Sequence, residues 1–169
     1  MQFGLSESQT ILKNNARKFF ANECPIAEVR RIAETPHAFD AALYAKMAEQ
    51  GFTGIIFPEQ YGGLGLGLVE MAALCEEMGR ALVPGPYFSS VMLAGALIDA
   101  CATPEQKTRL LTPIAEGTAR ATLAILERTA SWDPAAVVMT AAGNTLTGEK
   151  LFVVDAFTAA TIIVVANIS

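Results

Sequence analysis

The hydrophobic pattern of the chain changes near Thr118. Before this residue, apolar side chains recur at helical spacing between capping and breaking signals. After it, short β-branched runs alternate with the turn sequences "AGN" and "TGEK". Helices that precede strands, rather than alternating with them, predict an α+β multidomain fold. We therefore expect an all-α domain over residues 1–118 and a separate β domain that begins over residues 119–169.

The β part is short for an independent domain. About four or five strands would leave exposed edges and an open apolar face. We therefore expect residues 119–169 to be the incomplete start of a barrel-like middle domain, and the chain to be a piece of a longer protein.

Capping signals indicate where helices begin and end. Ser6, with Gln9 three residues later, forms a possible capping box, and Thr103 followed by Pro104 is typical of a helix start. Gly51 is well placed to cap a helix at its C-terminus. The ranges expected to be helical are 7–24, 27–34, 39–50, 68–82, 88–102 and 103–115.

Two of these helices carry further expectations. The helix over 88–102 is almost wholly apolar, so it should be buried on most sides. The helix over 68–82 has a mixed pattern. Its expected inward residues are Val69, Ala72, Ala73, Leu74, Met78 and Leu82, and its expected polar side holds Glu70, Glu76, Glu77 and Arg80.

Composition argues against several classes of function. The net charge is −5 and no Lys/Arg cluster occurs, which argues against nucleic acid and anionic membranes, although an anionic ligand such as coenzyme A stays possible. His37 is the only histidine and no CxxC occurs, so we predict no metal site and a loop position for His37. Cys24, Cys75 and Cys101 are expected to be reduced and mostly buried.

The two ends of the chain bear on its location. The N-terminus lacks the basic and apolar regions of a signal peptide. The apolar run "TIIVVA" near the other end is far too short to span a bilayer. A cytoplasmic protein is expected.

Four glycines fall within six residues of the stretch "PEQYGGLGLG", which begins at Pro58. A dinucleotide-binding loop should follow a strand, open a helix and lie in a βαβ unit, but this loop has helices on both sides in sequence. The Gly-Lys-Ser/Thr of a Walker A loop is absent. We expect the preceding "FTGIIF" to be extended. We interpret the glycines as an irregular turn, in which they supply positive φ and allow close backbone packing.

The same region resembles a known family. The stretch "MAEQGFTGIIFPEQYGGLGLGLVEMAALCEEMGRAL" is similar to the signature of the helical N-terminal domain of acyl-CoA dehydrogenases, "AE-G--G---P--YGG-G" followed by a helix with "EE-G". Three more stretches resemble the family in the same order: "FGLSESQTILKNNARKFFANE", "TPEQKTRLLTPIAEGTARATLAI" and "LTGEKLFVVDAFTAATIIVVA". The resemblance covers essentially the whole chain, and the motifs are specific when taken together.

The resemblance implies a longer subunit, in which a C-terminal helical domain outside this chain follows the helical and middle β domains. It implies FAD as cofactor and an acyl-CoA thioester as substrate, dehydrogenated between its α and β carbons with hydride transfer to flavin N5. The family's base is a glutamate of the C-terminal domain, so no catalytic residue is assigned here. Glu76 and Glu77 point about 100° apart on a helix and are interpreted as surface charges.

Two segments can be compared with the family's flavin-contacting motifs residue by residue. Where the family has "A-x-T-E-P-x-x-G-S-D", residues 124–133 keep the glutamate as Glu127 but replace the threonine by Leu126. Where it has "G-x-K-x-W/F-I-T-N", residues 148–155 keep the aromatic as Phe152 but replace a hydroxyl residue by Val154. The cofactor-binding positions implied by the resemblance are Leu126, Glu127, Trp132, Phe152, Val153 and Val154.

The two lost hydroxyls bear on the affinity for flavin. Each neutral hydrogen bond is worth only about 1 kcal/mol net, so flavin affinity or potential can shift without loss of binding, because backbone N–H groups remain. The backbone of Val153 can still contact the ring. Trp132, the only tryptophan, either lies near the flavin or acyl pocket or is a packing residue at a strand end.

These residues are consistent with several functions. The first is an FAD-dependent acyl-CoA dehydrogenase, with electron-transfer flavoprotein as electron acceptor and a homo- or hetero-oligomeric assembly. The second is a same-fold acyl-CoA oxidase, nitroalkane oxidase or flavin-dependent monooxygenase. The third is a non-catalytic partner subunit, a reading that Leu126 and Val154 keep open.

Overall fold

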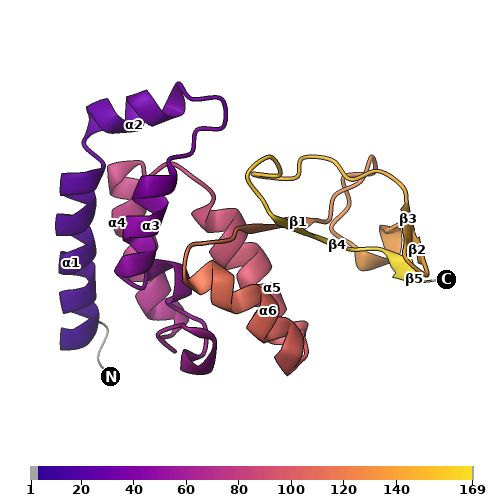
Figure 1. Ribbon diagram of the computed structural model, residues 1–169, viewed down its shortest axis with the longest axis horizontal. Helices are drawn as coiled ribbons and strands as arrows, with labels where there is room; N and C mark the ends of the chain where they lie inside the picture. The colour runs from indigo at the N-terminus through magenta and orange to yellow at the C-terminus, as the bar shows by residue number, and fades with distance from the viewer. Residues whose placement is uncertain (1–3, 169) are drawn as a thin grey trace.

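The computed structural model describes residues 4–168, except for the side chain of residue 134. Helices fill one part of the molecule and strands the other, in that order along the chain (Figure 1). The helical part comprises α1 (Glu7–Glu23), α2 (Ile26–Ala33), α3 (Ala41–Glu49), η1 (Phe52–Gly54), η2 (Glu59–Tyr61), α4 (Leu68–Ala81), the π-helix η3 (Phe88–Gly95), α5 (Ala96–Cys101) and α6 (Pro104–Ala115).

The strands form two small sheets, which confirms the predicted α+β fold with an incomplete β part. They are β1 (Ala121–Ala124), β2 (Thr140–Ala142), β3 (Thr145–Thr147), β4 (Thr161–Val164) and β5 (Asn167–Ile168), with η4 (Pro134–Ala136) before β2. Strands β1 and β4 pair in parallel, and β2 lies between antiparallel β3 and parallel β5. The sheets do not close into a barrel within residues 4–168.

The predicted helix caps are present. Ser6 Oγ accepts the N–H of Gln9 at 3.2 Å, and the Gln9 side chain accepts the N–H of Ser6 at 2.8 Å. Thr103 makes the same reciprocal pair with Gln106, and Pro104 occupies the first helical position. Gly51 follows α3 with a left-handed φ of 74°. Local sequence signals therefore place these helix ends correctly.

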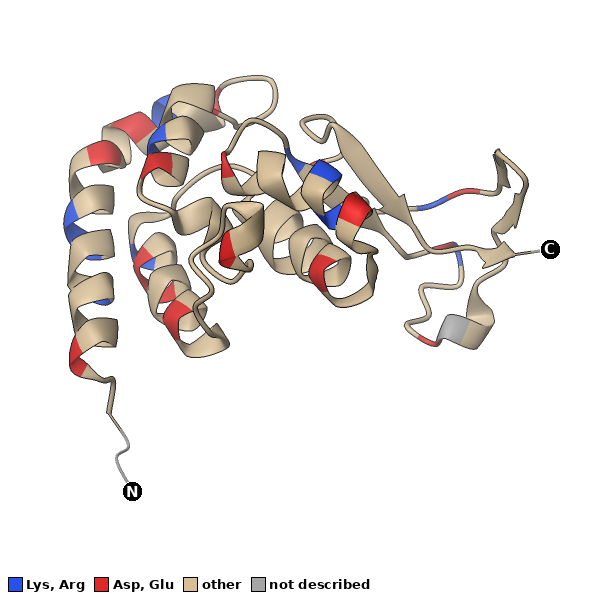
Figure 2. Ribbon diagram, turned by 60° about the horizontal axis from the view of Figure 1, so that its bottom comes forward, with Lys and Arg blue, Asp and Glu red and all other residues tan. Residues whose placement is uncertain are grey.

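The core lies among α1, α2, α3, α4, η3 and α6. Helix α1 runs alongside α4, and α5 and α6 lie between this group and the strands (Figure 1). Charged residues of both signs are interspersed over the helices (Figure 2). None of the helices within residues 4–168 is long and apolar enough to cross a membrane. The largest fully buried side chains include Phe20, Ile32, Met47, Ile55, Phe57, Leu74, Val91, Leu111 and Ile114.

The stretch "FTGIIF" is not extended, and that prediction was wrong. The chain instead turns through η1, where the N–H of Gly54 donates to Gly51 O at 3.2 Å. The N–H of Phe57 then donates to Gly54 O at 3.1 Å. The left-handed conformation at Gly51 reverses the chain, so the apolar side chains reach the core from a compact turn rather than from a strand.

The glycine-rich stretch is a packing turn, as interpreted from the sequence. Gly62 and Gly65 have φ values of 83° and 61°. A Cβ on Gly63 would lie 2.0 Å from the carbonyl oxygen of Phe57. The N–H of Gly65 donates to that carbonyl at 2.8 Å. Backbone N–H groups of the turn therefore donate to a neighbouring segment of the same chain instead of pointing towards a phosphate.

Helix α4 differs from its predicted inward face. Val69 and Leu82 are exposed, as is Ala72, whereas Glu77 is buried. Glu77 receives a two-point contact from Arg17 of α1, with Nε–Oε2 and Nη2–Oε1 distances of 2.9 and 2.8 Å. The prediction that Glu77 is a surface charge was therefore wrong, because a cation on a distant helix satisfies it; Glu76 is exposed as predicted.

The thiols and the long apolar helix also differ in part from expectation. All three cysteines are free, but only Cys24 is buried, whereas Cys75 is half-buried and Cys101 is exposed at the end of α5. The range 88–102 is helical, but its first half is the π-helix η3, and Phe88 is exposed. His37 lies in a loop, as predicted, and stacks on Phe157.

Candidate functional site

An apolar cavity of about 340 Å³ lies where the β part meets η3. Its walls come from η3, from β1 and the residues that follow it, and from the segment before β4. The lining residues are Phe88, Leu93, Leu123, Ile125, Leu126, Trp132, Leu151, Phe152 and Val154. Leu126, Trp132, Phe152 and Val154 were all predicted to face a cofactor, so four of the six predicted positions meet at one cavity.

Two hydrogen bonds hold the predicted segments side by side. The N–H of Leu151 donates to the carbonyl of Leu126 at 2.8 Å. The buried hydroxyl of Thr122 donates to the carbonyl of Val154 at 2.6 Å. These bonds join the segment before β4 to β1, although about thirty residues separate them in sequence.

Two of the three aromatic residues that line the cavity, Trp132 and Phe152, are largely exposed. The side chain of Phe152 is 84% exposed and that of Trp132 is 72% exposed. Phe152 also has a φ of 53°, a left-handed conformation that is strained for a bulky residue. Large exposed rings beside an apolar cavity are typical of a surface that a ligand or another part of a protein covers.

The other two predicted positions do not line the cavity. Glu127 is buried, and its carboxylate accepts the N–H of Val138 at 2.8 Å and of Met139 at 3.0 Å. It also accepts Lys150 Nζ at 2.8 Å. The Lys150 hydrogen bond and these two N–H groups lower the pKa of Glu127 to about 2. Glu127 therefore holds the β part together, and Val153 is half-buried outside the lining.

The Glu127→Gln variant tests this structural role through pH. The carboxylate has an ordinary pKa of about 4.3 when unfolded. Because its folded pKa is near 2, its stabilising contribution is complete above about pH 4.3 and is lost as pH falls towards 2. The variant should be less stable than the wild type at pH 7, and the difference should vanish near pH 2. Urea unfolding at several pH values measures it.

Glu149, the residue before Lys150, provides a matched control. Glu149 pairs with Arg128, but both side chains are largely exposed. Glu149→Gln should leave stability nearly unchanged at every pH, because exposed ion pairs contribute little. An equal, pH-independent loss in both variants would contradict the role assigned to Glu127.

The lining of the cavity is compatible with a flavin ring. All nine lining side chains are apolar or aromatic, which suits the flat hydrophobic face of such a ring. Leu126 and Val154 replace the hydroxyl residues of the family pattern. Backbone groups would therefore have to meet the polar edge of a bound ring. The N–H groups of Phe152 and Val153 make no hydrogen bond among the described residues and remain as donors. The site therefore fits the ring, with fewer donors than the family pattern supplies.

Sequence reasoning missed the contribution of the helical part. Phe88 and Leu93 reach the cavity from η3, far from the matched motifs in sequence. The available signal was the apolar run over 88–102, which predicted burial but not a cavity wall. π-Helical turns are rare and occur often at functional sites.

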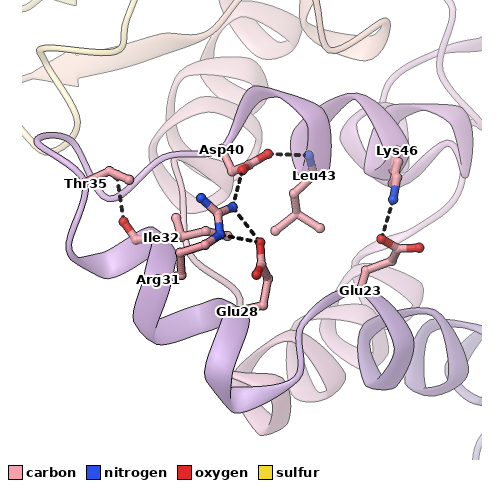
Figure 3. Close-up of polar contacts among 8 residues, drawn as sticks. All are labelled: Glu23, Glu28, Arg31, Ile32, Thr35, Asp40, Leu43 and Lys46. Carbon is pink, nitrogen blue, oxygen red and sulfur yellow. Dashed lines mark hydrogen bonds and ion pairs between the residues drawn. The ribbon is translucent and has the colours of Figure 1, made fainter.

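A second, charged hollow of about 280 Å³ lies between α2 and α3. Figure 3 shows that Arg31 reaches both Glu28 and Asp40, while Lys46 pairs with Glu23 of α1. The hydrogen bond from Arg31 lowers the pKa of Glu28. Each of these charges already has an opposite partner in the described structure. The hollow is therefore an ion-pair network on the surface rather than a ligand site.

The family model described as "Acyl-CoA dehydrogenase, N-terminal domain" matches residues 6–118. This chain belongs to the acyl-CoA dehydrogenase family. The match covers the helical part, whereas the cavity described above lies where that part meets the strands.

Similarity to individual family members extends through the β part. "Probable acyl-CoA dehydrogenase YngJ" of Bacillus subtilis (strain 168) is 32% identical over 172 residues, covering 98% of this chain and 45% of the relative. The ChsE4-ChsE5 complex from Mycobacterium tuberculosis has a TM-score of 0.87 at 25% identity, with 100% of this chain and 46% of that chain covered. An acyl-CoA dehydrogenase complexed with FAD from Bacillus anthracis has a TM-score of 0.85 at 26% identity, with 97% and 29% covered. The chain thus spans less than half the length of these relatives.

Proposed function

We propose that this chain forms part of an FAD-dependent oxidoreductase that dehydrogenates an acyl-CoA thioester between its α and β carbons. The observation that carries the proposal is the apolar cavity at which Leu126, Trp132, Phe152 and Val154 meet. These are four of the positions that the family pattern aligns with flavin contacts. Membership of the family and the FAD-bound relative support the same cofactor.

Bound FAD would accept the hydride that leaves the β-carbon. The role of this chain's residues is to bind, orient and exclude water. Phe152 and Trp132 would cover the ring, and the N–H groups of Phe152 and Val153 would donate to its polar edge. The apolar wall at Leu126 and Val154 would keep water from the reacting carbons, which strengthens every electrostatic interaction there.

The α-proton must go to a base from another part of the protein. No carboxylate is among the residues that line the cavity. Glu127, which follows the lining residue Leu126 in sequence, is held ionised by Lys150 and two N–H groups, with its pKa near 2. An acceptor so stabilised as an anion is a poor base for a weakly acidic carbon acid. We propose that the base lies outside these 169 residues.

The second candidate function is that of a non-catalytic partner subunit. It is favoured by the loss of both hydroxyl donors at Leu126 and Val154, since no other polar side chain lines the cavity. The similarity to a ChsE4-ChsE5 complex, which joins two chains, supports a hetero-oligomer. For either candidate we propose an acyl-CoA ligand, electron-transfer flavoprotein as electron acceptor and an oligomeric assembly.

A visible absorption spectrum of the protein at its full natural length tests the proposal. We expect an oxidised-flavin spectrum that bleaches when a panel of acyl-CoA thioesters is added without oxygen. A flavin that does not bleach would indicate the partner-subunit function. Rapid reoxidation of the bleached flavin by oxygen would indicate an oxidase or monooxygenase. A protein without bound flavin, even after incubation with FAD, would contradict the proposed cofactor.

Restoring the hydroxyls tests the residues assigned to the cavity. In Leu126→Thr and Val154→Thr, each new hydroxyl should tighten FAD binding by about fivefold, because a neutral hydrogen bond contributes about 1 kcal/mol. FAD titration followed by flavin fluorescence measures the effect. Leu146→Thr is the matched control, since Leu146 is an exposed residue of β3 that does not line the cavity. Equal effects in all three variants would contradict the assignment.

A further inference from the structure

The loop between β3 and β4 connects the cavity to the helical part of the molecule. Within it, Asp155 accepts a hydrogen bond from Ser89 Oγ of η3 at 2.6 Å. Ser89 is fully buried, and its hydroxyl also lies 3.2 Å from the carbonyl oxygen of Pro86. A hydroxyl has one proton to donate, and the shorter contact to a charged acceptor is the stronger one. The buried serine thus fixes Asp155 to the π-helix.

The backbone around this contact is strained at two positions. Phe152 and Asp155 both have left-handed φ values, 53° and 55°. Aspartate tolerates this conformation, but a bulky aromatic residue adopts it only where its surroundings impose it. The Phe152 side chain is 84% exposed, and the residue makes no hydrogen bond among those described. The neighbours of Phe152, rather than its own contacts, therefore impose its conformation.

Three contacts, one before Phe152 and two after it, can impose this conformation. On one side, the N–H of Leu151 donates to the carbonyl of Leu126. On the other side, Val154 is bonded through its carbonyl to Thr122, and Asp155 through its side chain to Ser89. The first two contacts join the loop to β1 and its continuation. Only the third joins this stretch to the helical wall of the same cavity.

We propose that Asp155 is a positioning residue, which through its hydrogen bond from Ser89 holds Phe152 and Val154 against the cavity wall formed by η3. Asp155 does not itself line the cavity, so it acts through these two residues. The link matters because η3 carries Phe88 and Leu93, which also line the cavity. Its consequence for flavin affinity rests on the proposed function, whereas its consequence for the cavity does not.

The variants separate the hydrogen bond from the backbone strain. Asp155→Gly removes the acceptor but tolerates a positive φ without cost, so it isolates the lost bond. Asp155→Asn keeps an acceptor oxygen and tolerance of that conformation but loses the charge, so it should keep part of the hydrogen bond and lie between Asp155→Gly and the wild type. Ser89→Ala removes the donor from the helical side. Thr158→Val is the control, because it removes a second hydroxyl contact to the backbone of Asp155 and leaves the Ser89 bond intact.

Two measurements are made on the protein at its full natural length. The first is acrylamide quenching of Trp132, with any tryptophan outside these 169 residues replaced by phenylalanine, since the chain has one tryptophan and it lines the cavity. The second is the dissociation constant for FAD. We expect Asp155→Gly and Ser89→Ala to weaken FAD binding about tenfold, as for a lost hydrogen bond to a charged group. Quenching should rise by at most about 1.4-fold, because Trp132 is already 72% exposed. Thr158→Val should match the wild type, and Asp155→Asn should lie between the wild type and Asp155→Gly.

The outcomes distinguish the two proposals. Wild-type quenching and FAD affinity in both Asp155→Gly and Ser89→Ala would overturn the positioning role, and so would an Asp155→Asn variant that is as impaired as Asp155→Gly. Should Asp155→Gly not fold, Ser89→Ala gives the same test from the other side. Changed quenching with no FAD binding in any variant or the wild type would support the positioning role and overturn the proposed cofactor.

Discussion

Replacing Gly63 with alanine is expected to destabilise the protein by about 3 kcal/mol or more, because the added methyl group has no space. Its Cβ would lie 2.0 Å from the carbonyl oxygen of Phe57, 2.5 Å from the carbonyl carbon and 2.7 Å from the oxygen of Gly54. All three atoms belong to the backbone, so no side-chain rotation can relieve the contact. Relief requires the turn to separate from the 54–57 segment, which breaks the bonds that Leu64 and Gly65 make to it.

The free energy of unfolding, from urea titration followed by circular dichroism, measures this loss. Gly79→Ala is the matched control. Gly79 lies within α4, a Cβ there would have no atom within 4 Å, and its φ is not positive. Alanine should therefore be neutral or stabilise the helix by about 0.5–1 kcal/mol. Similar stabilities for the two variants would show that the glycine-rich turn does not depend on close backbone packing.

The sequence predicted those parts of the fold whose cause is local. The capping box at Ser6, the N-cap at Thr103 and the left-handed glycine after α3 are set by residues within one turn of the helix end, so a single sequence displays them. The same local reasoning gave a wrong prediction for the segment that precedes Pro58. Its apolar run is equally consistent with a buried strand and a buried turn, and contacts with Gly63 decide between them.

At the candidate site, too, only part of the arrangement could be predicted from the sequence. The resemblance to family motifs identified Leu126 and Val154, which line the cavity, because a motif preserves residue positions. It also identified Glu127, whose side chain instead binds Lys150 and the backbone before β2. A motif states that a glutamate belongs there but not which way it points. The contribution of Phe88 required the packing of a distant helix, which no local pattern contains.

The second large effect is expected at Glu77, which joins α1 to α4. Its side chain is fully buried and contacts Arg17 at 2.8 and 2.9 Å and Arg80 at 3.2 Å. Replacing it with glutamine keeps its shape but removes the charge, so the contacts to both arginines become weak neutral ones. We expect a loss of about 2 kcal/mol in the free energy of unfolding at pH 7, since hydrogen bonds to charged groups contribute about 1.5–3 kcal/mol.

The neighbouring residue supplies the control for this loss. Glu76 pairs with Lys13 at 2.5 Å but is itself exposed, so Glu76→Gln should change stability by less than about 0.5 kcal/mol. If both glutamates acted only through the total charge of α4, the two variants would lose the same free energy of unfolding.

The pH dependence of the Glu77 effect follows from its pKa. The hydrogen bond from Arg17 lowers the pKa of Glu77 below its ordinary value, with further contributions from the charges of Arg17, Arg80 and Lys13. Its stabilising contribution is therefore complete above about pH 4.3, the ordinary glutamate value, and is lost as the pH falls through the lower folded value. The gap between wild type and Glu77→Gln should be constant from pH 8 to about pH 5 and should narrow in acid. A gap that widens in acid would mean that the pKa of Glu77 is higher in the folded protein than in the unfolded chain, which would contradict an ion pair between α1 and α4.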